Sequence, residues 1–366
     1  MIRFQADQGA AVTFVGLAGS PLIERASGIQ HVPIFPVESP VRPWTLLAAV
    51  ARAVGHRAPD VVHVHGSQDF NALLPWIARE RFLRRMPPLV LQMHIWVSHS
   101  KRDPLHALSY RWVDQLWCSS EPAKRSIERL LPIARSKIRI LRYGRPMDLI
   151  LKGMLSRSQA RAELGVPDDA VVVGSVSRID RGKGTAELIE GAVRTMRAEP
   201  RLHLVLIGGP TEAPAEIAFA RRLSGDVQAL PADLRSRVHL MGPLAASHRL
   251  LRAFDLFALP TYRECFSLAL MEAQLAGLPC LATDAGGSPE LVKEGLTGWL
   301  CAPESTDSFA SALSRALADR ARWPEFGARA SARMRTEFDL EPALAETLAG
   351  YRSASELCAR RVNYFN

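Results

Sequence analysis

The sequence has few cysteines and no long apolar run. Its five cysteines are scattered, and no two of them form a C-x-x-C pair: Cys118, Cys265, Cys280, Cys301 and Cys358. A disulfide framework or a zinc site is therefore not expected, and a reducing cytoplasm is the favoured compartment. No apolar run approaches the roughly 20 residues that span a bilayer, and the chain does not open with a signal-peptide pattern. These absences disfavour secreted disulfide-rich proteins and integral membrane proteins.

The sequence also lacks repeats, coiled-coil heptads and low-complexity tracts. Its 366 residues, 48% of them hydrophobic, exceed what one ordinary core holds and suit two domains of roughly 150 to 200 residues. We expect a first domain over residues 1–165, a second over 166–338, and a terminal helical segment over 339–366.

The net positive charge of the chain comes from its first half. Residues 1–150 carry 20 Lys and Arg against 11 Asp and Glu, which accounts for the whole net charge of +9. A basic surface on the first half would suit the binding of nucleic acid, anionic lipid or a phosphorylated acceptor. The alternative is a solvated arginine-rich surface with no binding role. The basic residues gather from Lys124 to Arg145 and around Arg79, Arg81, Arg84 and Arg85.

Short apolar runs alternate with amphipathic stretches throughout. Near-continuous apolar strands separated by helices indicate parallel sheets covered on both faces. The sequence thus predicts an α/β protein of two Rossmann-like domains facing each other across a cleft, with ligands beyond the carboxyl ends of the strands. The expected strands lie within residues 11–16, 60–65, 88–94, 115–120 and 137–142 of the first half, and 170–180, 201–209, 237–242, 255–260 and 278–284 of the second.

Two cations follow the first strand of the second half. Arg178 and Lys183 stand in SRIDRGKG (177–184), a Gly-containing turn that leads into a helix, where they can clamp a pyrophosphate. The spacing is not that of a P-loop. Taken alone, two such cations are more often solvated loop charges than a phosphate clamp.

Two glutamates flank the next candidate site, in YRECFSLALMEAQLAG (262–277). We expect Cys265, Phe266, Ser267 and Leu268 to form the first turn of a helix, whose free N–H groups and positive dipole end favour a phosphate. Glu264, just upstream, suits neutral hydroxyls of a sugar, and Glu272, two turns into an apolar helix, suits a ribose diol. The alternatives are a capping role for Glu264 and an arginine partner for Glu272.

Together these segments resemble glycosyltransferase family 4, whose members have the GT-B fold. The resemblance rests on VSRIDRGKG (176–184), LVLIGG (204–209), VHLMGPL (238–244), the E-x7-E run of Glu264 and Glu272, and AGGSPELV (285–292). The first half matches more loosely, through DVVHVHG (60–66), PLVLQMH (88–94) and ILRYGRPMD (140–148).

The resemblance implies a role for each candidate residue. Arg178 and Lys183 would neutralise the donor diphosphate, and the amides of Cys265 to Leu268 would hold the phosphate of the leaving nucleotide. Glu264 would bind the transferred sugar and Glu272 the ribose, while the loop from Gly242 to Leu244 would flank the base. His94 would face the donor sugar across the cleft, although a histidine after a strand is by itself more often structural.

The family transfers a sugar with retention of anomeric configuration, using a UDP- or GDP-linked donor. The sequence contains no Asp-x-Asp motif, so we expect no metal and no cofactor beyond the nucleotide-sugar co-substrate. The clamp and the helix dipole would stabilise the leaving diphosphate instead. The expected acceptor is a glycan of the cell envelope, a lipopolysaccharide or an exopolysaccharide, including lipid-linked forms. A cytoplasmic protein in peripheral contact with anionic membrane would reach such an acceptor.

Two departures from the family pattern qualify this expectation. Only MIRFQADQGA (1–10) precedes the first strand, where the family has a strand, a glycine-rich loop and a helix, so the sheet would lack its central strand. Tyr143 stands where the family usually has Asn. A non-catalytic nucleotide-sugar-binding protein is therefore the alternative. A sugar-nucleotide epimerase fits the E-x7-E run poorly, and no nucleic-acid-binding motif is present.

Overall fold

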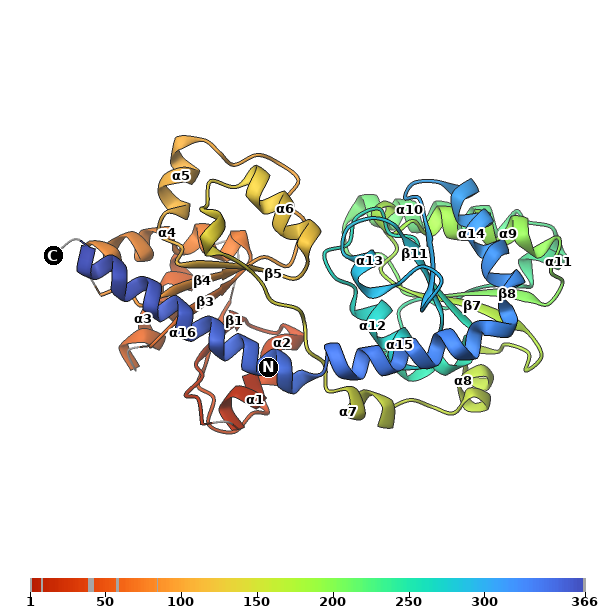
Figure 1. Cartoon of the computed structure of the whole chain (residues 1–366), viewed down its shortest axis with the longest axis horizontal. Helices are drawn as coiled ribbons and strands as arrows, with labels where there is room; N and C mark the ends of the chain where they lie inside the picture. Colours follow the sequence, from red (N-terminus) through yellow and green to blue (C-terminus); the bar gives the residue numbers. More distant parts are fainter. Residues whose placement is uncertain (1, 8, 39–42, 57–58, 84, 365–366) are drawn as a thin grey trace. The chain divides into compact units, whose positions relative to one another are not determined.

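The computed structural model describes residues 2–7, 9–38, 43–56, 59–83 and 85–364. The chain forms two compact units (Figure 1). The first unit comprises residues 1–144 and 340–366, and the second comprises residues 145–339. Arg84, which belongs to the basic cluster around Arg79, lies outside the described residues.

The first unit contains two parallel sheets. One pairs β1 (Phe14–Leu17) with β2 (Ile34–Val37). The other has the order β3 (Val62–His65), β4 (Leu89–Gln92), β5 (Gln115–Cys118) and β6 (Ile138–Ile140). Among the described residues no strand joins the two sheets. The carboxyl ends of β3 and β4 therefore lie side by side, with His65 paired in register with Gln92.

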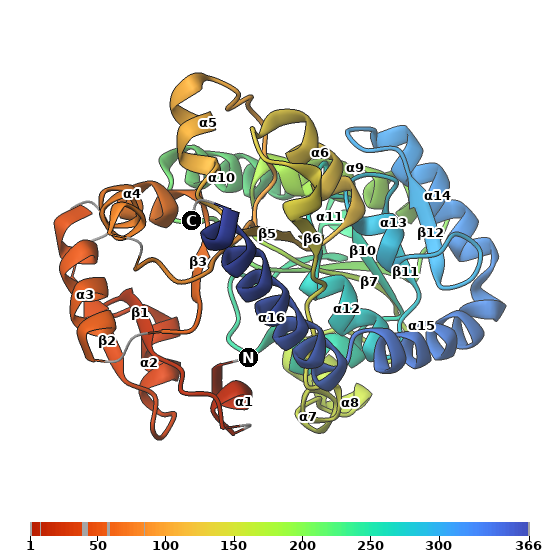
Figure 2. The same cartoon turned by 60° about the vertical axis from the view of Figure 1, so that its left-hand side comes forward.

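Helices cover the sheets of the first unit: α1 (Ile2–Asp7), α2 (Pro21–Ser27), α3 (Pro43–His56), α4 (Ser67–Phe82), α5 (Pro104–Tyr110), α6 (Glu121–Leu130) and α16 (Leu340–Tyr364). A short 3-10 turn, η1 (Arg135–Lys137), precedes β6. The long α16 runs along the four-stranded sheet (Figure 2). Tyr351 of α16 packs against Trp117 of β5, and Gln115 donates a hydrogen bond of 2.9 Å to Ser353.

The second unit is built on one parallel sheet with the order β12, β11, β10, β7, β8, β9. The chain moves outward from β7 through β8 to β9, then returns to the other side of β7 with β10, β11 and β12. This reversal makes the gap between β7 and β10 the topological switch point, where open α/β sheets bind ligands. The strands are β7 (Val171–Val176), β8 (Leu202–Ile207), β9 (Val238–Leu240), β10 (Leu256–Leu259), β11 (Cys280–Thr283) and β12 (Gly298–Cys301).

Helices lie on both faces of this sheet (Figure 1). On one face are α9 (Thr185–Met196), α10 (Pro214–Gln228) and α14 (Thr306–Ala318); on the other are α12 (Leu268–Leu275) and α15 (Trp323–Glu337). Shorter elements complete the unit: α7 (Met147–Lys152), α8 (Arg157–Leu164), η2 (Arg181–Lys183), α11 (Ala232–Arg235), η3 (Ser247–Ala253), α13 (Ser288–Leu291) and η4 (Arg320–Arg322). The core between sheet and helices is mainly aliphatic, and its largest members are Trp299, Trp323, Phe309 and Phe326.

Residues 145–165, which the sequence analysis assigned to the first domain, pack with the second unit. Arg161 of α8 is fully buried and explains this placement. Its guanidinium forms an ion pair of 2.8 Å with Asp255 and donates to the backbone oxygens of Asp168, at 2.6 Å, and Ala253, at 3.1 Å. A buried arginine needs all of these partners, so the segment is fixed beside β10.

All ten expected strands are present, which confirms the α/β prediction. Nine are shorter than expected at one or both ends, and β1 begins later and ends one residue later than expected. Two further strands, β2 and β12, were not predicted. All five cysteines are buried free thiols.

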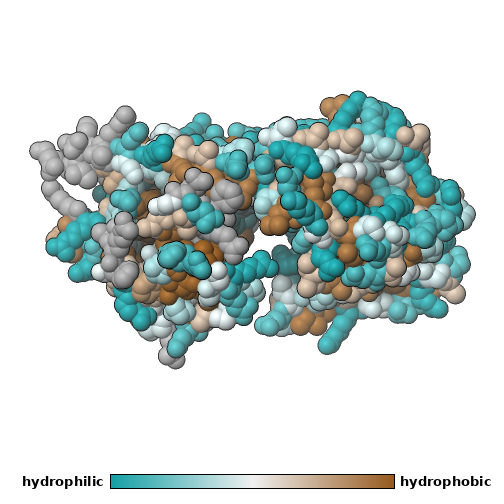
Figure 3. All heavy atoms as spheres, turned by 90° about the horizontal axis from the view of Figure 1, so that it is seen from below, coloured by the Kyte–Doolittle hydropathy of each residue, from teal (hydrophilic) through white to brown (hydrophobic). Residues whose placement is uncertain are grey.

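No helix of the described chain combines the length and the apolar content that crossing a bilayer requires. Some large apolar side chains are nevertheless exposed. Trp44, Phe82 and Leu105 each expose at least 70% of their surface. On the face drawn in Figure 3, hydrophobic and hydrophilic residues are interspersed.

Candidate functional site

Two loops at the switch point bring a cation and an acid together. Lys183 ends η2 in the loop that follows β7, and Glu264 lies in the loop that follows β10. The Lys183 ammonium donates to Oε2 of Glu264 at 2.6 Å, and both side chains are about four-fifths buried. The structure therefore places these two predicted residues at the edge where the fold favours a ligand.

Backbone hydrogen bonds fix these loops to each other. The amide of Tyr262 donates to the oxygen of Gly182 at 2.8 Å, and the Thr261 hydroxyl donates to the same oxygen at 3.0 Å. The amide of Gly287, in the loop after β11, donates to the backbone oxygen of Glu264 at 2.7 Å. Three loops that the sequence singled out thus form one hydrogen-bonded edge.

Two glycines make this close approach possible. Gly184 has φ +66°, and a Cβ placed on it would lie 1.9 Å from the backbone oxygen of Pro260. Gly286 has φ +56°, and its Cβ would lie 2.2 Å from the backbone oxygen of Glu264. Any side chain at either position would push the β10 loop out of place.

The helix after β10 begins later than the sequence predicted. Cys265 and Phe266 precede α12 rather than forming its first turn, because Ser267 caps the helix by accepting a hydrogen bond of 3.2 Å from the amide of Leu270. The cap leaves the amides of Leu268 and Ala269 as the first-turn donors that the helix itself cannot satisfy. Burial, with a smaller contribution from Glu264, raises the pKa of the Cys265 thiol to about 12, so it stays neutral.

Glu272 pairs with Arg145, a partner that the sequence did not specify. The carboxylate lies just past the first turn of α12, not two turns in, because the helix begins at Leu268. Its side chain is 16% exposed and that of Arg145 is 29% exposed. The ion pair explains how an acid is tolerated on this apolar helix, and it leaves part of the carboxylate accessible.

Arg178 does not join the pair of Lys183 and Glu264. Its guanidinium lies 3.2 Å from Asp180 and 3.2 Å from Glu216, and 56% of the side chain is exposed. The hydroxyl and the amide of Thr211 both donate to Glu216, and they lower its pKa, with a smaller contribution from Arg178. Arg178 thus lies over the start of α10.

The loop after β9 is tied to the loop after β8. The amide of Gly208 donates to the backbone oxygen of Gly242 at 2.8 Å, and the amide of Ile179 donates to that of Gly209 at 2.9 Å. Leu244, in the loop after β9, exposes 36% of its surface. Gly242 and Leu244 therefore lie on the same carboxyl edge as Lys183.

His94 belongs to the first unit and follows the carboxyl end of β4. Its Nε2 lies 2.8 Å from Nδ1 of His65, and its Nδ1 lies 2.7 Å from the hydroxyl of Tyr143. Burial lowers the pKa of His94, so its imidazole is neutral near pH 7. Neither His65 nor Tyr143 was among the predicted site residues, and Tyr143 was expected only as a departure from the family pattern. The H-x-H sequence of β3 was the available signal for His65.

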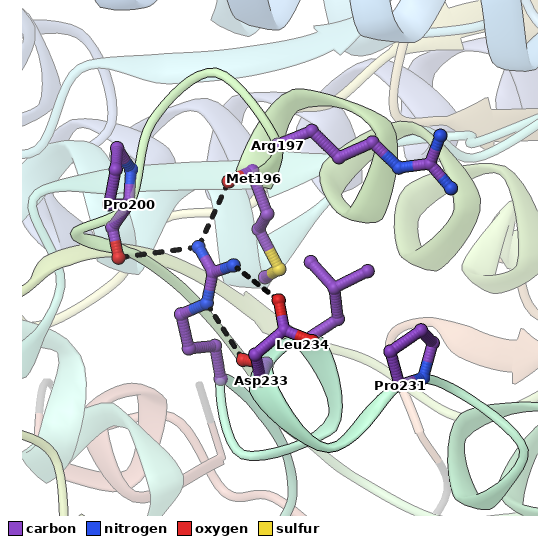
Figure 4. A pocket seen from close by; sticks show the side chains of 7 residues that line it. Met196, Arg197, Pro200, Pro231, Asp233 and Leu234 are labelled. Atoms are coloured by element: carbon purple, nitrogen blue, oxygen red, sulfur yellow. Dashed lines mark hydrogen bonds and ion pairs between the residues drawn. The ribbon is translucent and has the colours of Figure 1, made fainter.

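Two cavities of similar size lie in the second unit. One, of about 460 Å³, is drawn in Figure 4 and lies before β8 and β9, at the amino ends of the strands. Arg237 lines it and donates to the backbone oxygens of Met196 and Glu199 at 3.0 and 3.2 Å, which is a structural role. The other, of about 470 Å³, lies between α9 and α10 and reaches Arg181 and Tyr262 beside the switch point.

Family models match both halves of the chain. The model described as Glycosyltransferase Family 4 matches residues 1–148, and the one described as Glycosyl transferases group 1 matches residues 170–319. The first match lies mainly in the first unit and the second match lies within the second unit.

Similar curated proteins are D-inositol 3-phosphate glycosyltransferases. The protein of Kribbella flavida is 30% identical over 349 residues, covering 88% of this chain and 78% of that protein. The protein of Mycolicibacterium smegmatis is 28% identical, covering 94% and 81%.

Solved structures show the same fold. Sucrose-phosphate synthase from Thermosynechococcus elongatus superposes with a TM-score of 0.76 at 22% identity, covering 96% of this chain and 90% of that one. Anabaena HepE in complex with UDP and glucose superposes with a TM-score of 0.75 at 24% identity, covering 92% and 91%.

Proposed function

Because the chain belongs to the group 1 glycosyltransferases of family 4, with the two parallel α/β units of the GT-B fold, we propose that it transfers a hexose from a UDP-sugar to a hydroxyl of a phosphorylated acceptor. The chain is a retaining glycosyltransferase that uses a nucleotide-sugar donor. The observation that carries the finer proposal is the contact between Lys183 and Glu264 at the switch point.

The donor diphosphate binds at this contact. Its phosphates draw Lys183 away from Glu264, because two or three anionic oxygens outcompete one carboxylate for the ammonium. The N-terminal amides of α12, at Leu268 and Ala269, add the positive end of a helix dipole. Arg178 is 56% exposed, and it turns from Glu216 toward the second phosphate.

The two acids then act on different parts of the donor. Release from Lys183 frees Glu264 to accept hydrogen bonds from hydroxyls of the transferred sugar. Glu272 stays paired with Arg145 and uses its remaining lone pairs for the ribose hydroxyls. Residues Gly242 to Leu244 flank the base, and His94 forms a hydrogen bond with the transferred sugar.

The transfer keeps the anomeric configuration by a front-face course. The bond from the anomeric carbon to the diphosphate oxygen breaks, and a new bond to the acceptor oxygen forms on the same face. The acceptor proton passes to the departing phosphate. Lys183, Arg178 and the α12 amides stabilise the charge that develops on the diphosphate, which a metal ion need not do in this scheme.

UDP is favoured over GDP as the donor nucleotide. The structural neighbour HepE was crystallised with UDP and glucose, and separately with UDP-glucose. The short loop after β9, with its exposed Leu244, offers an apolar contact that suits the smaller uracil ring.

The acceptor carries phosphate or another anionic group. The first half of the chain holds the whole positive excess, and the curated relatives are named for inositol 3-phosphate. Cell-envelope glycans, lipopolysaccharide and exopolysaccharide intermediates, including lipid-linked ones, meet this description. Such an acceptor would bring a cytoplasmic protein into peripheral contact with anionic membrane.

One observation favours the alternative, a protein that binds a nucleotide sugar without transferring it. Among the described residues, β1 and β2 are not hydrogen bonded to the four-stranded sheet. A weakly connected first unit would impair acceptor binding but leave the donor site of the second unit intact.

A transfer assay tests the proposal. The purified chain is incubated in EDTA with radiolabelled UDP-glucose, UDP-galactose or UDP-N-acetylglucosamine and with inositol phosphate or a phosphoglycan as acceptor. We expect release of UDP with a product of retained configuration, identified by proton NMR of the anomeric signal. An inverted product would contradict the mechanism, and donor binding without any transfer would favour the alternative.

A further inference from the structure

Three side chains form a hydrogen-bonded series at the carboxyl edge of the first unit. His65 ends β3, His94 follows β4, and Tyr143 follows β6. The distances from His94 are 2.8 Å to Nδ1 of His65 and 2.7 Å to the Tyr143 hydroxyl. The rings of His65 and His94 are nearly parallel, at 6°, with centroids 5.1 Å apart. Both nitrogens of His94 are therefore engaged at once.

The partners of a neutral imidazole decide which of its nitrogens carries the proton. Such a ring has one N–H donor and one acceptor nitrogen. Burial lowers the pKa of His94, and burial together with His94 lowers the pKa of His65 to about 4, so both rings are neutral in the working range. Only one of the two nitrogens of His94 can donate.

In the hydrogen bond between Tyr143 and His94, the Tyr143 hydroxyl is the better donor and the His94 nitrogen is the better acceptor. The phenol proton is polarised, while the phenol oxygen is a poor acceptor because one lone pair is delocalised into the ring; an unprotonated imidazole nitrogen is a good acceptor. The favourable arrangement has Tyr143 donating to Nδ1 of His94. His94 then carries its proton on Nε2 and donates to Nδ1 of His65.

We propose that Tyr143 is a positioning residue, which holds His94 in the Nε2-protonated tautomer and fixes the orientation of its ring. A sugar hydroxyl that accepts from this N–H replaces His65 as its partner, while Tyr143 keeps its bond to Nδ1. When no sugar is bound, Nδ1 of His65 accepts the hydrogen bond from Nε2–H of His94. This inference rests on the proposed contact between His94 and the transferred sugar.

The chain offers a matched control. Tyr351 of α16 forms the same kind of bond with a different histidine, 2.8 Å from its hydroxyl to Nδ1 of His63. Tyr351→Phe and Tyr143→Phe each remove one hydroxyl and keep the aromatic ring. Only the second change removes a partner of His94.

The first test measures the tautomer directly. Long-range nitrogen–proton NMR of the full chain labelled with ¹⁵N-histidine distinguishes the two nitrogens of each ring, and loss of a signal in His94→Gln assigns His94. We expect a proton on Nε2 of His94 in the unaltered chain, a mixture of tautomers in Tyr143→Phe, and no change for His94 in Tyr351→Phe. A proton on Nδ1 in the unaltered chain, or an unchanged tautomer in Tyr143→Phe, overturns the inference.

The second test is kinetic. Tyr143→Phe should lower kcat about tenfold with little change in KM for the donor, as expected when a hydrogen-bond donor that positions the transferred sugar is misoriented. Tyr351→Phe should leave kcat within about twofold. An unchanged kcat in Tyr143→Phe, when His94→Gln is inactive, overturns the positioning role. An active His94→Gln contradicts the proposed function of His94 instead, and the NMR result then decides the tautomer alone.

Discussion

Lys183 and Glu264 lie 81 positions apart in the chain, yet the ammonium of one donates to the carboxylate of the other at 2.6 Å. Neither residue is on a regular strand or α-helix; both stand on loops that leave adjacent strands at the switch point. The contact holds a cation and an acid about four-fifths buried and mutually satisfied. In the proposed function, the donor diphosphate separates them.

Loss of the Lys183 cation should slow transfer strongly. Lys183→Ala removes the positive charge that stabilises the leaving diphosphate. We therefore expect kcat to fall about 10²- to 10³-fold, as when one preorganised donor to the transition state is removed in other enzymes. Lys152→Ala, which removes an exposed lysine of α7, is the control. Steady-state release of UDP measures both. An active Lys183→Ala would refute the clamp.

Glu272→Ala should weaken UDP binding more than Glu264→Ala does. The ribose contact persists in free UDP, while the sugar contact does not, so Glu272→Ala should raise the Kd at least about tenfold. Calorimetric titration with UDP gives the comparison, and Glu163→Ala, an exposed acid of α8, controls for charge. Equal Kd values for the two variants would show that the assigned roles are wrong.

Gly286→Ala should displace the backbone of Glu264. Its Cβ would lie 2.2 Å from the Glu264 oxygen, whereas a Cβ on Gly295 meets nothing within 4 Å. Both glycines have positive φ, +56° and +70°, so both substitutions carry the same backbone strain of about 1 kcal/mol. We expect Gly286→Ala alone to lose transfer activity. Comparable activity in the two variants would contradict the account of this loop.

Acid should destabilise the first unit through His63. Burial, with contributions from His65 and His94, lowers the pKa of His63 to about 2. Between about pH 6.5 and 2 the unfolded chain therefore binds more protons at this position, and the free energy of unfolding falls as the pH falls.

Urea unfolding at pH 7 and pH 5 measures this effect. Tryptophan fluorescence reports mainly on the first unit, because five of the seven tryptophans lie in its residues 1–144. One of them is Trp117, whose indole lies 5.0 Å from the His63 ring. His63→Leu should flatten the pH dependence, while His99→Gln, at an exposed position, should leave it unchanged. The same slope in His63→Leu as in the unaltered chain would assign the acid sensitivity to other groups.

Much of the fold could be predicted because apolar runs in parallel sheets are nearly continuous. The two strands that were not predicted are atypical: β2 contains Pro36 and β12 begins with Gly298, both disfavoured in strands. The start of α12 was placed too early, since YRECFSLAL offers an apolar run but only Ser267 can cap it.

The partners within the site could not be predicted from the sequence. Arg145 lies 127 positions from Glu272, and no local pattern links them. The sequence left open that Glu272 pairs with an arginine, but it did not identify which one. Likewise, only the order of strands in the sheet shows that β7 and β10 are neighbours and that Lys183 therefore meets Glu264.

The most direct test of the account is calorimetric titration of the purified chain with UDP and with GDP in metal-free buffer, repeated with Lys183→Ala. The account predicts that UDP binds more tightly than GDP and that the substitution weakens UDP binding at least about tenfold. A folded chain that binds neither nucleotide, or that binds UDP equally well without Lys183, would contradict it.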